Sequence, residues 1–368
     1  MVAPIDIDVL FRQSEGLADD LHTLIPTVGE QVRAVAADLR SKPHGPVYLV
    51  GCGDSFHAAN AARMSYQSMG EVACEAVSAR RFLDYDVAAP AFRRAPAVVV
   101  GASASGRTPV VAAALGTARR AGALTVALTG DLTGPVADAA EHGVALPLRE
   151  LESSPGVRTY QATLLAMLLL AAELGPARLD GALAELEMLP EHVAATARTA
   201  RAVSADVAEV VAGWQAVLVT GGGPSHGTAQ FVAAKLVETA GMTAVAQDLD
   251  EWWHVERRFR PAGAPLVVLA PPGRSFEHAR AVAVAAQELG RHVIGVTGPT
   301  AGIGSRQAVP VAADIREEFS PLLYHVFAAS LAAQVARRLG RRAFDGDPPA
   351  FPGSLDAFRR SAQAVPFD

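Results

Sequence analysis

Hydrophobic positions along the chain fall into short continuous runs that alternate with alanine-rich amphipathic stretches. Six runs are rich in β-branched and aliphatic residues, and each leads through a turn containing small or polar residues into a helical pattern. They are Val47–Val50, Ala97–Val100, Leu124–Leu128, Ala216–Thr220, Leu266–Leu269 and Val293–Val296. A regular alternation of buried strand and helix predicts parallel sheets covered by helices on both faces, an α/β fold.

The pattern of the first half of the chain recurs in the second half. VGCGDSFHAAN at 50–60 aligns with TGGGPSHGTAQ at 220–230, and three further pairs follow in the same order at a slowly shrinking offset. Such ordered recurrence indicates an internal duplication. We therefore predict an N-terminal helical segment, two α/β lobes joined by a helical connector, and a proline-rich tail that wraps over the surface. The helical segment spans residues 1–45, the first lobe 46–176, the connector 177–213, the second lobe 214–345 and the tail 346–368.

Composition narrows the range of functions. The 368 residues carry a net charge of −6, which argues against bulk nucleic-acid binding because phosphate neutralisation needs a basic surface. The acidic N-terminal segment is a packing helix bracing the first lobe rather than a basic DNA-recognition helix. The apolar run Leu164–Ala172 is too short to span a membrane, and the first residues do not resemble a signal peptide. Two cysteines form neither a disulfide framework nor a zinc motif, so we expect a cytoplasmic protein without a metal.

One turn in the first lobe is suited to binding an anion. GASASGRT at 101–108 directly follows a buried strand, and its small residues allow close backbone approach to a ligand. The candidate donors are Ser103, Ser105 and Thr108, although an ordinary serine-capped turn would have the same sequence. GCGDSFHA at 51–58 follows the neighbouring strand and would bring Ser55 to the same crevice, and Thr159 opens a long helix nearby. A dinucleotide fingerprint fails here because Phe56 occupies the third glycine position.

The second lobe carries different chemistry. Its counterpart of the serine turn is APPGRSFE at 270–277, where prolines remove backbone donors, so we expect one phosphate site per chain. Lys235 and Glu238 share one face of a helix, and Glu238 is either a structural ion or a general base. His254 follows two tryptophans and is either a packed histidine or a catalyst.

Taken in order, GCGDSFHAA, SASGRT, SPGVRTYQATLL and AAKLVE…EWWHV resemble the tandem sugar isomerase (SIS) domains of glucosamine-6-phosphate synthase and the related deglycases. The resemblance covers about residues 45–345. It implies two SIS lobes, each a flavodoxin-like three-layer sandwich, acting on a phosphorylated sugar without a cofactor.

The resemblance also implies roles for individual residues. Glu238 would move a proton between C1 and C2, and His254, delivered from the other subunit of a homodimer, would assist ring opening with support from Glu251. The phosphate would be bound by Ser55, Ser103, Ser105, Thr108 and Thr159, and the sugar would lie near Gly53, Lys235, Trp252 and Trp253.

Departures from the family pattern refine the expectation. Ala104 stands where the serine turn often has glutamine, and the tail lacks the lysine that reaches the substrate carbonyl. No glutaminase precedes residue 45, so we expect chemistry that does not depend on glutamine: isomerisation, deamination or deglycation. Trp252 and Trp253 in EWWHVE suggest a bulkier, amine-linked substrate. The alternatives are a non-catalytic sugar-phosphate sensor and, disfavoured by Phe56, a nucleotide-dependent dehydrogenase.

Overall fold

The computed structural model describes residues 5–42, 45–94, 96–175 and 182–344. These residues divide into two compact units. The N-lobe comprises residues 23–149 and 159–175, and the C-lobe comprises residues 5–22, 150–158 and 182–344. The proline-rich tail expected over 346–368 lies outside the described residues.

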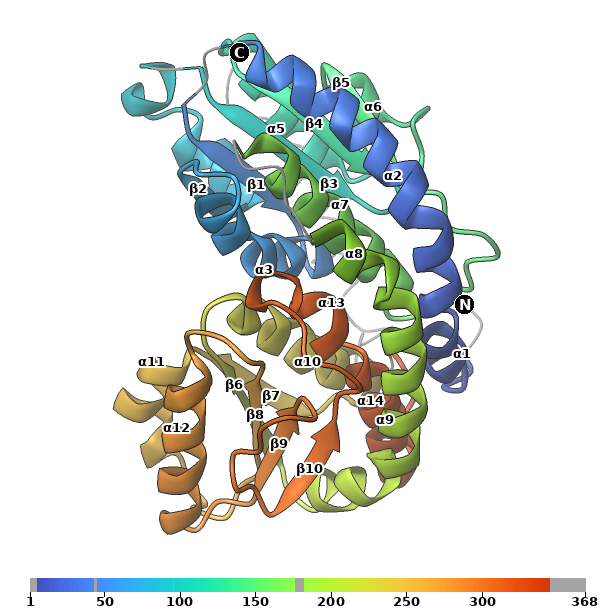
Figure 1. Ribbon diagram of the computed structural model, residues 1–368, viewed down its shortest axis with the longest axis vertical. Coiled ribbons are helices and arrows are strands. Elements are labelled where there is room, and N and C mark those ends of the chain that lie inside the picture. Colours follow the sequence, from blue (N-terminus) through green and yellow to red (C-terminus); the bar gives the residue numbers. More distant parts are fainter. Residues whose placement is uncertain (1–4, 43–44, 95, 176–181, 345–368) are drawn as a thin grey trace, which may run out of the picture. The chain divides into compact units, whose positions relative to one another are not determined.

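The N-lobe contains a five-stranded parallel sheet in the order β2-β1-β3-β4-β5 (Figure 1). Its three inner strands are the three runs predicted from the first half of the sequence, and they are almost wholly buried. In the register, Leu49 lies beside Ala76 on one side and Val100 on the other. The strands are β1 (Val47–Gly51), β2 (Cys74–Ser78), β3 (Val98–Ser103), β4 (Leu124–Thr129) and β5 (His142–Ala145).

Helices cover the N-lobe sheet, as the strand–helix alternation predicts. The apolar run Leu164–Ala172 lies in a buried helix, α7, in agreement with the sequence analysis. The helical elements are the greater part of α2 (Leu17–Arg40), α3 (Asp54–Ser68), α4 (Ala79–Arg81), η1 (Phe82–Asp86), η2 (Pro90–Arg93), α5 (Pro109–Arg120), α6 (Pro135–Asp138) and nearly all of α7 (Arg158–Leu174).

The C-lobe has a second five-stranded parallel sheet, in the order β7-β6-β8-β9-β10. This is the strand order of the N-lobe with each strand replaced by its counterpart, so the α/β fold expected for both halves is confirmed. The strands are β6 (Ala216–Gly221), β7 (Thr243–Gln247), β8 (Leu266–Ala270), β9 (Val293–Thr297) and β10 (Gln307–Pro310).

Helices also flank the C-lobe sheet (Figure 1), with α9, α10 and α14 packed together beside it. Helix α1 joins this group: Arg337 pairs with Asp8, and the Arg201 guanidinium lies 3.2 Å from the Phe11 ring centre. The helical elements are α1 (Val9–Glu15), α8 (Ala182–Glu187), α9 (Leu189–Ala212), α10 (Pro224–Ala240), α11 (Leu249–His254), η3 (Glu256–Arg258), α12 (Phe276–Glu288), η4 (Glu317–Phe319), α13 (Pro321–Tyr324) and α14 (Phe327–Leu339).

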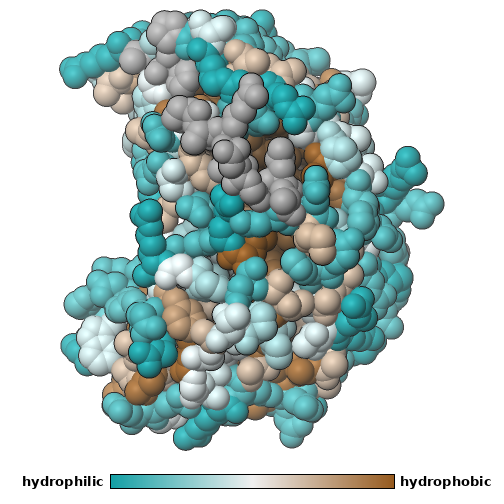
Figure 2. Space-filling model, in the orientation of Figure 1, coloured by the Kyte–Doolittle hydropathy of each residue, from teal (hydrophilic) through white to brown (hydrophobic). Residues whose placement is uncertain are grey.

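The surface is predominantly hydrophilic on the face that Figure 2 shows, with hydrophobic residues scattered among the polar ones. Within the described ranges, no helix combines the length and the apolar character needed to cross a lipid bilayer.

Candidate functional site

The serine turn connects the central strand β3 of the N-lobe to helix α5. Ser103 is the last residue of β3, and Thr108 is the residue before Pro109, which begins α5. The Ser103 and Thr108 hydroxyl oxygens lie 2.8 Å apart, so one hydroxyl donates to the other. The Ser105 hydroxyl accepts a hydrogen bond from the Arg107 backbone N–H at 3.3 Å. The turn thus presents its hydroxyl groups at the start of a helix.

Gly106 allows this turn to be tight. Its φ is +68°, in the left-handed region that favours glycine, and a Cβ atom here would approach both the Asp131 carbonyl and the Thr129 hydroxyl to 2.7 Å. The Gly106 carbonyl accepts from the Val136 N–H at 3.1 Å. Close backbone approach to the neighbouring β4 loop therefore fixes the shape of the turn.

The first glycine-rich turn joins β1 to α3. Gly53 precedes α3 with a φ of +52°, and Asp54 and Ser55 form the first turn of the helix. Gly223 has almost the same φ, +56°, before α10 in the C-lobe. At both positions the backbone needs a positive φ just before a helix begins, and glycine adopts this conformation readily.

A pocket of about 280 Å³ lies at the carboxyl ends of β1 and β3. All five residues proposed as phosphate donors line it, although they come from three separate parts of the N-lobe. The lining residues are Cys52, Asp54, Ser55, Ala102, Ser103, Ala104, Ser105, Thr108, Thr159 and Tyr160. Gly53 is not among them, but it lies between Cys52 and Asp54, which are.

The charges around the pocket are unusual for an anion site. Among its lining residues there is one carboxylate, Asp54, and no lysine or arginine. The nearby Arg107 is exposed and pairs with Asp131 at 2.8 Å. Hydrogen bonds from Thr133 and the pairing with Arg107 hold the pKa of Asp131 below its usual range. Attraction for an anion must therefore come from hydroxyls, backbone N–H groups and the amino ends of α3 and α5.

In the C-lobe, Lys235 and Glu238 form an ion pair on α10. The Lys235 side chain is fully buried, and its Nζ lies 2.5 Å from Glu238 Oε2. The Glu238 side chain is 31% exposed. Glu238 is therefore held by a buried ammonium while part of its side chain remains exposed.

The segment EWWHVE forms α11 and the residues that follow it. His254 is 63% exposed and its Nε2 lies 3.6 Å from Asp250 Oδ2, and Glu251 is also exposed. The two tryptophans differ sharply. Trp252 is fully buried in the hydrophobic core, whereas Trp253 is 38% exposed and stacks on the Arg257 guanidinium at 4.8 Å. Only Trp253 is therefore available for contact with a substrate on this surface.

Apart from the two alanines, three lining residues were not proposed as site residues from the sequence: Cys52, Asp54 and Tyr160. Each is adjacent to a residue that was, since Cys52 and Asp54 belong to the GCGDSFHA motif and Tyr160 follows Thr159. Asp54 is the most consequential, because a carboxylate here would repel a phosphate but could accept hydrogen bonds from sugar hydroxyls. Burial raises the pKa of the Cys52 thiol, so it is a poor nucleophile.

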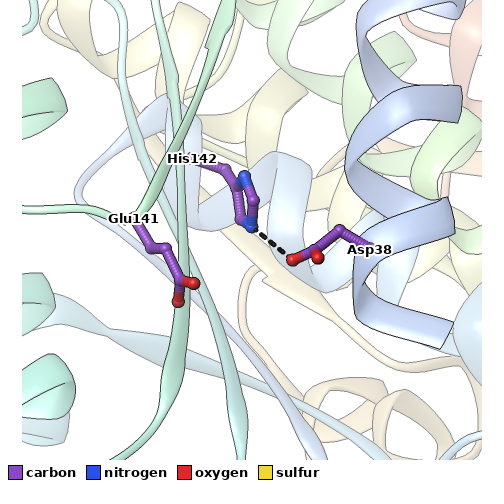
Figure 3. Close-up of side chains that lie close together, drawn as sticks. All are labelled: Asp38, Glu141 and His142. Carbon is purple, nitrogen blue, oxygen red and sulfur yellow. Dashed lines mark hydrogen bonds and ion pairs between the residues drawn. The ribbon is translucent and has the colours of Figure 1, made fainter. Parts of the chain in front are cut away.

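A second polar cluster lies at the amino end of β5 (Figure 3), where His142 Nε2 is 2.9 Å from Asp38 Oδ2. Glu141 completes a group whose ligand atoms are close enough to hold a metal ion. However, the Lys42 ammonium lies 2.6 Å from Asp38 and 3.2 Å from Glu141. Lys42 and His142 lower the pKa of Asp38. The cluster thus already contains a side-chain cation, which offsets one of its two negative charges.

The sequence is similar to known proteins over most of its length. Residues 41–173 match the SIS domain family. The chain is 26% identical over 323 residues to the glutamine–fructose-6-phosphate aminotransferase (isomerizing) of Gloeobacter violaceus, with 82% of this chain and 50% of the relative aligned. It is 25% identical over 225 residues to the fructoselysine 6-phosphate deglycase of Escherichia coli O157:H7, covering 60% of this chain and 64% of the relative.

The fold is shared with solved structures. The C-terminal domain of glucosamine-fructose-6-phosphate aminotransferase from Francisella tularensis superposes with a TM-score of 0.80 at 14% identity, covering 91% of this chain and 97% of that domain. The chain spans about half the length of the Gloeobacter aminotransferase that it matches. Residues 41–173 therefore match the SIS domain, and the chain is similar in sequence to the isomerizing aminotransferases and to the fructoselysine 6-phosphate deglycases.

Proposed function

We propose that this protein binds a hexose 6-phosphate in the N-lobe pocket and rearranges it at C1–C2 by proton transfer. The observation that carries the proposal is the convergence of Ser55, Ser103, Ser105, Thr108 and Thr159 on one pocket. Their hydroxyls, together with the amino ends of α3 and α5, form a set of neutral donors suited to a phosphate monoester. Binding at the unreactive phosphate then orients the reacting carbons.

Glu238 is the proposed base. Its ion pair with the buried Lys235 fixes the carboxylate on α10, and its partial exposure leaves it able to exchange a proton with a substrate. A carboxylate at C1–C2 would take a proton from one carbon and return it to the other through an enediol or enolamine. Lys235 would then act on the sugar only through the position of Glu238, because its own side chain is fully buried.

His254 is the proposed aid to ring opening, with Glu251 nearby on the same helix. The exposure of His254 on α11 suits delivery to the site of a second copy, so we propose a homodimer in which each active site is shared. Trp253 lies beside His254 and would contact the part of the substrate attached at C1 or C2.

Isomerisation, deamination and deglycation all use this proton transfer. The relationship to the fructoselysine 6-phosphate deglycase supports an amine-linked substrate. We propose that the reaction takes place in the cytoplasm and does not depend on glutamine or a cofactor.

Calorimetry and thermal shift with three phosphosugars test the proposal: glucosamine 6-phosphate, fructose 6-phosphate and fructoselysine 6-phosphate. A ligand at a hundred times its dissociation constant adds about 2.7 kcal/mol of stability, so binding is readily detected. We expect stabilisation by at least one phosphosugar and none by the matching free sugar. If no phosphosugar binds, the pocket is structural and the proposal fails. Binding without turnover of any of the three would favour a sugar-phosphate sensor.

A further inference from the structure

The C-lobe has its own turn at the position of the serine turn. β8 is the central strand of its sheet, as β3 is in the N-lobe, and residues 271–275 lead from β8 into α12. Prolines occupy the first two positions of this turn. These prolines lack backbone donors, which is why the sequence predicts no second phosphate site, but the backbone N–H groups of Arg274 and Ser275 remain as donors.

Those donors are directed at a carboxylate of the same chain. Glu317 Oε2 accepts from the Arg274 N–H at 2.9 Å, and Oε1 accepts from the Ser275 N–H at 3.3 Å. The Ser275 hydroxyl donates to Oε1 at 3.0 Å. Two backbone groups and one hydroxyl at the amino end of a thirteen-residue helix thus bind one anionic group.

Gly273 allows the carboxylate to come this close. Its φ is +151°, and a Cβ atom at this position would lie 2.5 Å from Glu317 Cδ. Any side chain here would therefore displace the carboxylate. The turn has a shape that accommodates an anion directly against its backbone.

The segment that carries Glu317 is anchored on both sides. Arg316 forms a forked ion pair with Glu185, with its Nη2 2.8 Å from Glu185 Oε1. The Ser320 hydroxyl donates to the Glu317 carbonyl at 2.8 Å. These contacts hold the carboxylate in position at little further entropic cost.

We propose that the Glu317 carboxylate occupies a latent anion site in the C-lobe, as a built-in substitute for the phosphate that its N-lobe counterpart binds. This rests on the proposed function only for the comparison with the N-lobe; the site itself is defined by the contacts of Glu317. The carboxylate keeps the C-lobe turn closed to phosphate, and each chain consequently binds a single phosphosugar. Removing the carboxylate opens the turn to inorganic phosphate.

The test is the stoichiometry of inorganic phosphate binding by calorimetry on the full chain. Four proteins are compared: the parent, Glu317→Ala, an N-lobe variant with Ser103→Ala and Thr108→Val, and the combination of all three substitutions. We expect the parent to bind one phosphate per chain and Glu317→Ala to bind two. The N-lobe variant should bind none, and the combined variant should bind one. Glu318→Ala, which makes the same charge change one residue along, should bind like the parent.

The two proposals fail in different ways. Suppose that the N-lobe does not bind phosphate but that Glu317 blocks a latent site. The parent and the N-lobe variant then bind no phosphate, whereas Glu317→Ala and the combined variant each bind one. If Glu317→Ala folds and gains no phosphate, the latent site is refuted whatever the N-lobe does. Should Glu317→Ala be too unstable to purify in chloride, its recovery is compared in chloride and in phosphate. Recovery in phosphate alone supports the site, whereas equal loss in both contradicts it.

Discussion

Ser103 and Thr108 share a hydrogen bond across the serine turn, with 2.8 Å between their hydroxyl oxygens. One hydroxyl ends the central strand of the N-lobe and the other precedes the helix that follows, so the bond closes the turn at its base. Within the pair, one oxygen donates to the other and its partner can donate to a ligand. The pair therefore orients a donor toward the pocket before any ligand arrives.

Loss of this donor should weaken phosphosugar binding. For Ser103→Ala we expect a loss of roughly 10- to 100-fold in affinity, because a hydrogen bond to a charged group contributes about 1.5–3 kcal/mol. Calorimetry with the phosphosugar that stabilises the parent measures the change. Ser153→Ala, in an exposed loop outside the pocket, is the matched control and should bind like the parent. Equal affinity in the two variants would remove Ser103 from the site.

Glu238→Gln should abolish turnover while preserving phosphosugar affinity within a few-fold. It should also destabilise the protein, because a buried ammonium loses its carboxylate partner, at a cost of about 3–5 kcal/mol at most. Adding Lys235→Met removes the buried charge and should restore much of that stability without restoring activity. Turnover assays and denaturant unfolding on both variants separate the two roles. Activity in Glu238→Gln would exclude Glu238 as the base.

Stability should fall with acid because of His325. This side chain is fully buried against the Phe231 ring, and burial lowers its pKa from 6.5 to about 3. The unfolded chain binds a proton below pH 6.5 while the folded chain does not, so His325 disfavours folding increasingly as the pH falls from 6.5 towards 3. The slope approaches about 1.4 kcal/mol per pH unit. Unfolding at several pH values should give a shallower acid dependence in His325→Phe; an unchanged dependence would contradict this assignment.

Gly106→Ala should both destabilise the protein and disturb the pocket. The positive φ and the close approach of Thr129 and Asp131 lead us to expect a loss of about 1–3 kcal/mol. Gly122→Ala is the comparison, since Gly122 has a φ of +88° with nothing within 4 Å of the added atom. It should lose about 1 kcal/mol and retain phosphosugar affinity. A smaller loss in Gly106→Ala than in Gly122→Ala would argue against steric contact in the serine turn.

The two tryptophans should respond differently to substitution. Trp252→Ala removes a fully buried side chain from the core and should cost about 3–5 kcal/mol. Trp253→Ala should alter stability by about 1 kcal/mol or less and change the preference among C2-substituted hexose phosphates. Unfolding curves and competition assays measure the two effects. An unchanged preference in Trp253→Ala would leave the substrate contact without support.

The strands that the sequence predicted are the three inner strands of the N-lobe sheet and β6, β8 and β9 of the C-lobe. The four that it missed, β2, β5, β7 and β10, lie at the sheet edges, where within the described residues only one side of the strand pairs with another strand. Edge strands are partly exposed and carry residues such as Gln307, which is polar, and Pro310, which lacks a backbone N–H, so β10 has no continuous apolar run. The more deeply a strand is buried, the more clearly its run of apolar residues can be recognised in the sequence.

The N-lobe pocket was accessible to sequence reasoning because parallel topology brings the carboxyl ends of adjacent strands together. Other features were not, because they depend on contacts between distant residues. Glu317 is 43 residues from Arg274, and no local pattern connects the two. Burial likewise separated Trp252 from Trp253: they are neighbours in the sequence, but on α11 the first is fully buried and the second is partly exposed.

Helix α1 packs among partners that follow it at great distance along the chain. Ser14 donates to the Val326 carbonyl across 312 residues, and Arg337 reaches back to Asp8 across 329. During translation, the ribosome therefore makes α1 before the elements that will cover its apolar side, and α1 must wait for α14 to emerge. The strands of the N-lobe sheet, by contrast, are all synthesised within one continuous stretch, 47–145. The order of synthesis thus favours completion of the serine turn before the lobe that carries Glu238.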